Sequence, residues 1–166
     1  AVFTNLSQDH LDFHGTMENY LAAKGLLFSR LGNAFVADRG RQKYAVLNAD
    51  DPASRELSKL TAAQIITYGI DEPADVRAGE IALTAEGTVF RLTAFGESAE
   101  VKMKLLGKFN IYNALAAAAA ALAEGISLAD AASALSEASP VEGRMEMIEA
   151  GQPFLLKVDD AHTQDG

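Results

Sequence analysis

Three short apolar runs, separated by stretches with helical spacing, constrain the fold of this chain more than any other feature. The runs are residues 1–3, 44–48 and 64–68, and turn residues follow each of them. Apolar residues recur at helical spacing over 16–31, and a second helix is predicted over 52–60. Strands that alternate with helices in this order are typical of a parallel sheet with covering helices. We therefore predict an α/β fold built on a partial parallel sheet.

The middle of the chain changes to a period of two. From 76 to 105 apolar residues alternate with polar ones, which predicts a small antiparallel β meander with one solvent-exposed face. Helical spacing then returns over 111–124 and 128–138. Two closing strands are predicted near the end, over 145–148 and 154–159.

Length, charge and composition exclude several classes of protein. The 166 residues suffice for one domain or slightly more, and 49% apolar residues can build a core, so a disordered chain is excluded. A net charge of −9 has the wrong sign for a nucleic-acid-binding surface. No apolar segment is long enough to cross a membrane, and without cysteine neither disulfides nor thiolate metal sites can form. We expect a cytoplasmic protein that binds neither nucleic acid nor membrane. Because the chain starts without Met inside a predicted strand, we also expect a piece of a longer protein.

A dense polar cluster, Asp9–His14, directly follows the first predicted strand. Ligands of open parallel sheets bind beyond the carboxyl ends of the strands, so the cluster lies where a binding site is expected. His10 is one of four potential metal ligands within these six residues. The pattern fits a metal site, and it equally fits a solvated surface turn.

Lys24 lies within the apolar stripe of the helix predicted over 16–31. A lysine in such a position usually extends its methylene stem along the apolar surface and keeps its ammonium in water. The alternative is a functional buried amine, because burial favours the neutral form and a neutral amine can form covalent adducts. The residues alone leave both interpretations open.

Two further segments combine a structural explanation with a candidate function. Asp51 before Pro52 is typical of a helix start, whereas nothing in the sequence explains Asp50. Asn110 and Asn113 stand three residues apart at the start of a helix, so both amides can point the same way. Helix capping by Asn110 would account for part of that pattern. Neither segment is assigned to a ligand by its residues alone.

Charged residues also surround the last two predicted strands. Arg144 precedes one strand and Asp159 ends the other, so they could serve a nucleotide or pair with each other, and His162 follows shortly after. The phosphate-binding motif Gly-x-x-x-x-Gly-Lys-Ser/Thr is absent from the chain. A nucleotide bound by this chain is therefore bound without that loop.

The chain resembles the Mur ligase family in five segments taken together: Thr4–Gly15, Tyr20–Lys24, Asn48–Asp51, Gly107–Asn113 and Gly143–Glu146. Within the family, the members that add the third amino acid of the peptide resemble it most closely. The resemblance implies that residues 1–150 are the C-terminal two thirds of the family's central ATPase domain, and that 151–166 begin its C-terminal domain. It also implies that the phosphate loop, the uridine-binding domain and most of the incoming amino-acid pocket lie outside this chain.

The reaction implied by the resemblance is ATP-dependent amide formation. The family transfers the γ-phosphate of ATP to a substrate carboxylate, and the amine of an incoming amino acid attacks the acyl phosphate. The acceptor implied here is UDP-N-acetylmuramoyl-L-alanyl-D-glutamate, a UDP-N-acetylmuramoyl-dipeptide used to make peptidoglycan precursor. His10 is then expected to bind Mg²⁺. Lys24 is expected to carry a carbamate, which turns a cation into the oxygen ligand that Mg²⁺ prefers.

Nucleotide-binding residues follow from the resemblance as well. Asn110 and Asn113 are expected on the adenine side of ATP. Arg144 and Asp159 are expected at the ribose and phosphates, with His162 also counted among the nucleotide-binding residues.

Departures and alternatives accompany the resemblance. Asp160 stands where the family usually has an aromatic residue and Gln164 where it has proline, which affects the packing of the hinge between the domains. A folylpolyglutamate synthase-like ligase and a non-catalytic nucleotide-binding domain of the same fold stay open as alternatives. The sequence does not tell whether lysine or meso-diaminopimelate is added. We expect the chain alone to be inactive, and to self-associate through an unpaired sheet edge.

Overall fold

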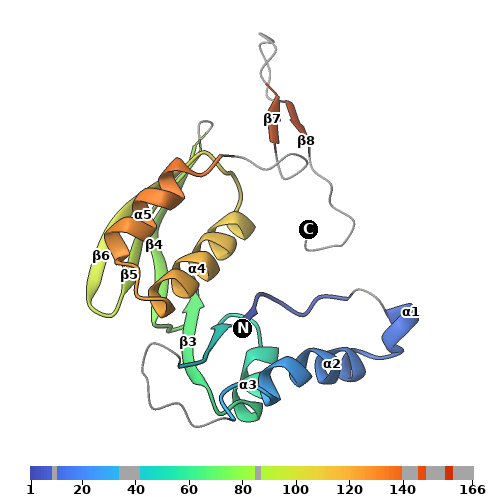
Figure 1. Cartoon of the computed structure of the whole chain (residues 1–166). Coiled ribbons are helices and arrows are strands. Elements are labelled where there is room, and N and C mark those ends of the chain that lie inside the picture. The colour runs from blue at the N-terminus through green and yellow to red at the C-terminus, as the bar shows by residue number, and fades with distance from the viewer. Residues whose placement is uncertain (9–10, 34–41, 85–86, 140–145, 149–155, 159–166) are drawn as a thin grey trace.

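A computed structural model describes residues 1–8, 11–33, 42–84, 87–139, 146–148 and 156–158. Within these ranges a six-stranded sheet runs in the order β1-β2-β3-β4-β5-β6, and β7 and β8 form a separate pair (Figure 1). The α/β fold class predicted from the sequence is confirmed. None of the helices in the described ranges is both long and apolar enough to cross a membrane.

In chain order the elements are β1 (Val2–Phe3), α1 (Leu11–His14), α2 (Met17–Ser29), β2 (Tyr44–Asn48), α3 (Ala53–Leu60), β3 (Gln64–Gly69), β4 (Val76–Leu83), β5 (Thr88–Ala94), β6 (Glu97–Met103), α4 (Lys108–Ala123), α5 (Leu128–Glu137), β7 (Glu146–Ile148) and β8 (Leu156–Val158). The predicted helices and strands are therefore present, with ends that differ by a few residues. β7 and β8 pair antiparallel, which confirms the two closing strands.

The first half of the sheet is parallel, as predicted. β2 lies between β1 and β3, with Leu47 opposite Phe3 and Val46 opposite Ile66. The hydroxyl of Thr16 accepts a hydrogen bond from the amide of Asn19 at 3.2 Å, so α2 is capped at the predicted residue.

Successive residues of β2 point to opposite faces of the sheet, and each face has its own core. Leu47 packs with Phe28 of α2 and Leu57 of α3. Val46 packs on the other face, in the cluster that contains Leu115 of α4. At β2 the sheet is thus covered on both faces, which explains why this strand is apolar without alternation.

The meander predicted over 76–105 is present as β4, β5 and β6, which are antiparallel. It continues the main sheet, because β4 also pairs with β3 in parallel, with Tyr68 opposite Val76 and Gly69 opposite Arg77. Parallel neighbours usually need a long crossover connection. Residues 70–75 suffice here because the two strands overlap over these two pairs alone.

Helix α4 begins earlier than predicted, and Asn110 is not its cap. The residue before the helix is Gly107, with φ +96°, a conformation that glycine adopts without strain. A β-carbon at Gly107 would also come within 2.6 Å of the Phe109 ring. Asn110 therefore lies inside the first turn, where its side-chain amide donates to the Leu106 carbonyl at 2.8 Å.

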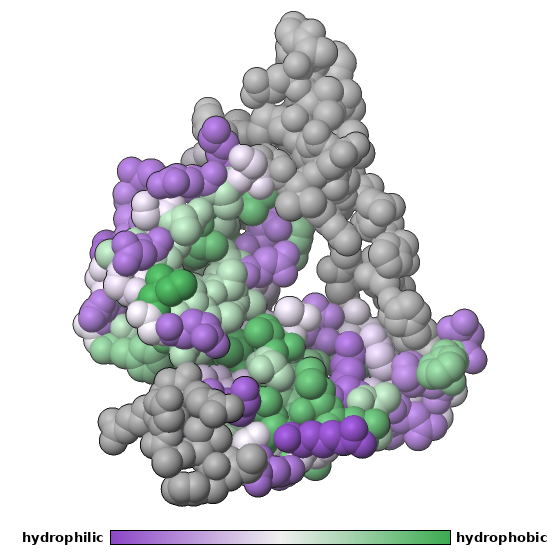
Figure 2. Space-filling view, in the orientation of Figure 1, coloured by the Kyte–Doolittle hydropathy of each residue, from purple (hydrophilic) through white to green (hydrophobic). Residues whose placement is uncertain are grey.

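Apolar side chains also remain on the surface of α2 and α3. Leu26, Leu27 and Leu60 are 57%, 59% and 47% exposed. In Figure 2 hydrophobic surface gathers in the lower middle of the view, where Figure 1 places these helices. Hydrophilic residues border it.

Candidate functional site

A cleft of about 360 Å³ opens at the carboxyl ends of β1 and β2, beside the start of α4. Ligands of parallel sheets bind at this edge. The residues that line it come from three segments, namely Thr4, Asn5, Leu6 and Ser7 after β1, Asn48, Asp50, Asp51 and Pro52 after β2, and Lys108, Phe109, Tyr112 and Asn113 on α4.

Asn48 and Asp51 fix the segment that follows β1. The Asn48 side-chain amide donates to the Thr4 carbonyl at 2.8 Å, and an Asp51 carboxylate oxygen accepts from the Leu6 amide at 2.7 Å. The other Asp51 oxygen accepts from the Ala53 amide at 2.8 Å. Asp51 thus binds the first amide of α3, but the helix begins at Ala53 with Pro52 at its N-cap position, one residue later than predicted. One wall of the cleft is therefore held by side chains from the β2–α3 loop.

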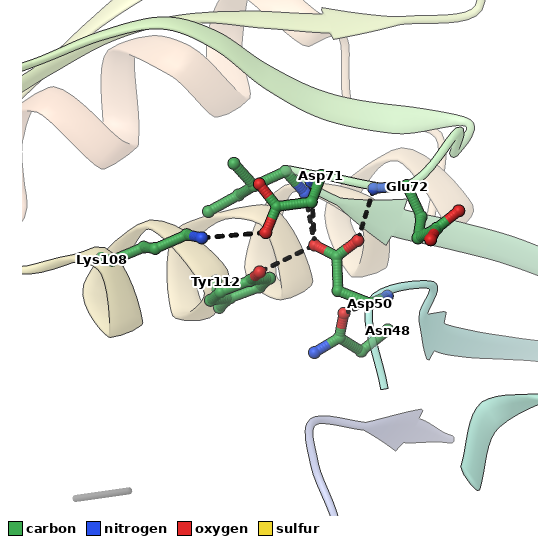
Figure 3. A network of polar contacts seen from close by, with 7 residues as sticks. Asn48, Asp50, Asp71, Glu72, Lys108 and Tyr112 are labelled. Carbon is green, nitrogen blue, oxygen red and sulfur yellow. Dashed lines mark hydrogen bonds and ion pairs between the residues drawn. The ribbon is translucent and has the colours of Figure 1, made fainter. Parts of the chain in front are cut away.

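Asp50, which the sequence left unexplained, accepts hydrogen bonds from two other elements (Figure 3). The amides of Ile70, Asp71 and Glu72 donate to its carboxylate at 2.7, 3.2 and 2.6 Å. The Tyr112 hydroxyl donates to the same carboxylate at 2.8 Å. Asp50 thus links the β3–β4 connection to α4.

These contacts shift the acidity of both partners. Partial burial by itself raises the pKa of Asp50, but the hydrogen bonds from Ile70, Glu72, Tyr112 and Asp71 outweigh it and hold the pKa below its usual value. Burial, the bond to Asp50 and its negative charge raise the pKa of Tyr112. Asp50 is therefore an anion at neutral pH, and Tyr112 is a neutral hydrogen-bond donor.

Lys108 places a positive charge at the same cleft. Its ammonium lies 2.9 Å from an Asp71 carboxylate oxygen and 6.0 Å from the centre of the Tyr112 ring. Both charged side chains of the ion pair are more than half exposed, and such pairs contribute little to stability. The Lys108 ammonium is therefore available to an anionic ligand at low energetic cost.

The two asparagines predicted on the adenine side have different environments. Asn113 lines the cleft, and its side-chain amide points to the Asn110 carbonyl oxygen at 3.4 Å. Asn110 is buried and is not among the residues that line the cleft. The structure thus brings the two amides together, with Asn113 at the cleft and Asn110 behind it.

Lys24 lies on α2 and is not among the residues that line this cleft. It is half-buried, and its ammonium sits 4.6 Å above the centre of the Tyr20 ring, a cation–π arrangement. His14 stacks on the same ring, with centroids 4.7 Å apart. A protonated amine cannot bind a metal ion, so ligation of Mg²⁺ by Lys24 requires the carbamate.

The other predicted residues, His10, Arg144, Asp159 and His162, lie outside the described residues. In the part of the chain that the structure describes, no three His, Asp or Glu side chains form a group that could hold a metal ion. Sequence reasoning missed Lys108, Tyr112 and the role of Asp50. One signal was present for Asp50, since it is an acid two residues after the end of the buried parallel strand β2.

Comparison with known proteins identifies the family. Residues 1–121 match the Mur ligase middle domain. The chain belongs to the Mur ligase family. A curated relative, the UDP-N-acetylmuramoyl-L-alanyl-D-glutamate–2,6-diaminopimelate ligase of Geobacillus kaustophilus, is 56% identical over 99% of this chain. The ligase of the same name from Listeria monocytogenes is 46% identical over the whole chain.

Solved structures agree with this assignment. MurF from Acinetobacter baumannii superposes with a TM-score of 0.81 at 29% identity, over 95% of this chain and 33% of that one. A UDP-N-acetylmuramoyl-L-alanyl-D-glutamate–2,6-diaminopimelate ligase gives 0.79 at 33% identity, over 99% and 33%. The Mur ligase chain described here spans about a third of the length of the curated relatives it matches, 33% for the Geobacillus enzyme.

Proposed function

We propose that this chain is part of an ATP-dependent ligase that joins 2,6-diaminopimelate to UDP-N-acetylmuramoyl-L-alanyl-D-glutamate. The observation that carries the proposal is the 56% identity, over 99% of the chain, with a curated ligase of that name. Relatives with the same name include those from Bacillus cereus and Lactiplantibacillus plantarum. Their names favour diaminopimelate over lysine as the amino acid added.

Within this ligase we assign the cleft beside α4 to the nucleotide. Asn113 would contact the adenine from the cleft wall, while Asn110 holds Asn113 through its side-chain carbonyl. The Lys108 ammonium would offset negative charge on the nucleotide. We keep Arg144 and Asp159 at the ribose and phosphates, with His162 among the nucleotide-binding residues, as predictions from the family resemblance.

Lys24 and His10 are the residues that would hold Mg²⁺, Lys24 through a carbamate. The metal ion would neutralise charge on the transferred phosphate. In the structure the Lys24 nitrogen lies 4.6 Å above the centre of the Tyr20 ring. Both metal ligands remain predictions from the family resemblance.

Two alternatives have weaker support. A folylpolyglutamate synthase from L. casei shares the fold with a TM-score of 0.75, but at 19% identity that likeness concerns the fold alone. A non-catalytic nucleotide-binding domain would need the same cleft without the Lys24 chemistry. The cytoplasmic location and self-association also stay predictions. Self-association is expected because β1 lies at the edge of the described sheet, with Val2 44% exposed.

A chimeric enzyme tests the proposal. The segment of the Geobacillus ligase that aligns with this chain is replaced by the chain, and ATP-dependent product formation is measured with diaminopimelate and, separately, with lysine. We expect ligation of diaminopimelate, which is lost on Lys24→Ala and kept on Lys59→Ala. Lys59 is a matched control because it lies on the surface of α3 and pairs with Glu56. A folded chimera without ligase activity would favour the non-catalytic alternative.

A further inference from the structure

The segment Asn48–Asp51 bonds to separate parts of the structure around the cleft. Asn48 and Asp51 hold the residues after β1, whereas Asp50 holds the β3–β4 connection and α4. Of the two acids that line the cleft, Asp51 bonds to Leu6 and Ala53, whereas Asp50 bonds to Tyr112 of α4 (Figure 3).

The Asp50 carboxylate has little capacity left for a ligand. One oxygen accepts from Ile70, Asp71 and Tyr112, and the other accepts from Glu72. Each carboxylate oxygen offers about two acceptor positions, so the oxygen that binds Tyr112 is saturated and the other has about one position left. A ligand at the oxygen that binds Tyr112 would have to displace one of its three donors.

Gly69 is what allows the carboxylate to come this close to β3. A β-carbon at Gly69 would lie 3.1 and 3.2 Å from the two Asp50 oxygens and 3.3 Å from the carbon between them. That is tighter than ordinary van der Waals contact, so a side chain at this position would push the carboxylate away. The absence of a side chain at Gly69 leaves room for the Asp50 carboxylate, and the amides of 70–72 donate hydrogen bonds to it.

We propose that Asp50 is a positioning residue: it fixes Tyr112, and with it the first turns of α4, against the nucleotide cleft. Lys108 lies one helical turn before Tyr112, and Asn113 is its neighbour, so a shift of Tyr112 moves both. The three amides of 70–72 hold the carboxylate in place from the opposite side. The assignment of the cleft to a nucleotide rests on the proposed function; the mechanical link itself does not.

Hydrogen exchange on the 166-residue chain tests the link without any activity. Tyr112→Phe removes one hydroxyl and keeps the ring, and Asp50→Asn removes the charge. We expect the amides of 112–114 to exchange about tenfold faster in both variants, the cost of one hydrogen bond to a charged group. The amides of 70–72 should exchange faster in Asp50→Asn only. Unchanged exchange over 112–114 in Tyr112→Phe would overturn the proposal.

The control for this experiment is Tyr44→Phe. The Tyr44 hydroxyl has a 3.5 Å contact with Gln42, away from the cleft lining. We expect exchange over 112–114 to match that of the unsubstituted chain. Faster exchange there in the control would mean that loss of any tyrosine hydroxyl loosens α4, which would also overturn the proposal.

Kinetics of the chimeric ligase test the consequence for nucleotide binding. Tyr112→Phe is expected to raise the KM for ATP about tenfold and to change kcat less than about twofold. If Tyr112 acts through Asp50, adding Tyr112→Phe to Asp50→Asn should raise the KM for ATP by less than about twofold more. Effects that multiply would show that Tyr112 contacts the nucleotide directly, against the proposal. Should the chimera not ligate, the proposed function fails while hydrogen exchange still decides the link.

Discussion

A β-carbon added to Gly32 would lie 2.4 Å from the amide nitrogen of Ala63. Gly32 follows α2, and Ala63 precedes β3, so the close approach sets how α2 lies against the parallel strands. Gly32 also has φ +81°, which disfavours any residue with a β-carbon. Two separate costs therefore oppose a side chain at this position.

We expect Gly32→Ala to destabilise the chain by several kcal/mol. The backbone conformation contributes about 1–2 kcal/mol, and forced separation from Ala63 adds about 1–3 kcal/mol. Gly125→Ala is the matched control, because Gly125 has φ +83° but open space around its β-carbon position. The free energy of unfolding, measured by urea titration, should fall more in Gly32→Ala. If both variants lose the same unfolding free energy, the backbone at Ala63 moves away from the added β-carbon without a measurable cost.

Asp50 should make stability depend on pH. Its pKa is lowered in the folded state, so its contribution is present above the pKa of the unfolded chain and is lost as the pH falls through the folded pKa. Asp50→Asn should cost about 1–3 kcal/mol at pH 7, the range for hydrogen bonds to a charged group. The difference from the unsubstituted chain should shrink below about pH 4. Urea midpoints at pH 7 and at pH 3 check it, and a difference that grows in acid contradicts it.

The sequence predicted the elements whose cause is local. β2 is a run of apolar residues, Thr16 caps α2, and Asp51 binds the first amide of α3; each depends on residues close by in the chain. The parallel strands were predicted from short apolar runs, and the meander from the alternation of apolar and polar residues. These features use interactions that a sequence displays directly.

The function of Asp50 could not be predicted, because its donors lie about twenty residues away at Ile70 and sixty-two away at Tyr112. The early start of α4 was missed for a different reason. Asn110 has the residue type of a cap, but Gly107 supplies the backbone conformation that starts the helix. Contacts between distant parts of the chain decided the role of Asp50, and the backbone conformation of Gly107 decided where α4 begins. The local sequence did not distinguish between the alternatives in either case.

Lys24 should be essential in the full-length ligase context. In the chimera, Lys24→Ala should abolish ligation, because the carbamate expected there cannot form. Added short-chain carboxylic acids should restore part of the activity, since they supply the lost carboxylate. Lys24→Arg should not be rescued, because its side chain and charge occupy the space above Tyr20. Full activity of the alanine variant without added acid would rule out a carbamate role.

The 166-residue chain by itself should not hydrolyse ATP. The phosphate-binding motif is absent from its sequence, so the phosphates lack most of their charge-assisted hydrogen bonds. ADP release with and without Mg²⁺ checks this, with Lys24→Ala as the background. Magnesium-dependent ADP release above that background would show that the chain carries a complete phosphate site.

Asn110 and Asn113 should separate stability from nucleotide binding. Asn110 is buried and donates to the Leu106 carbonyl, so Asn110→Ala leaves a buried acceptor unpaired and should cost about 1–3 kcal/mol of unfolding free energy. Asn113 is exposed in the cleft wall, so Asn113→Ala should change stability by less than about 0.5 kcal/mol. In the chimera, however, Asn113→Ala should raise the KM for ATP, because it removes the side-chain amide that we propose contacts the adenine. Urea titration and ATP kinetics on the same two variants measure both effects. An unchanged KM for ATP in Asn113→Ala would place the adenine elsewhere.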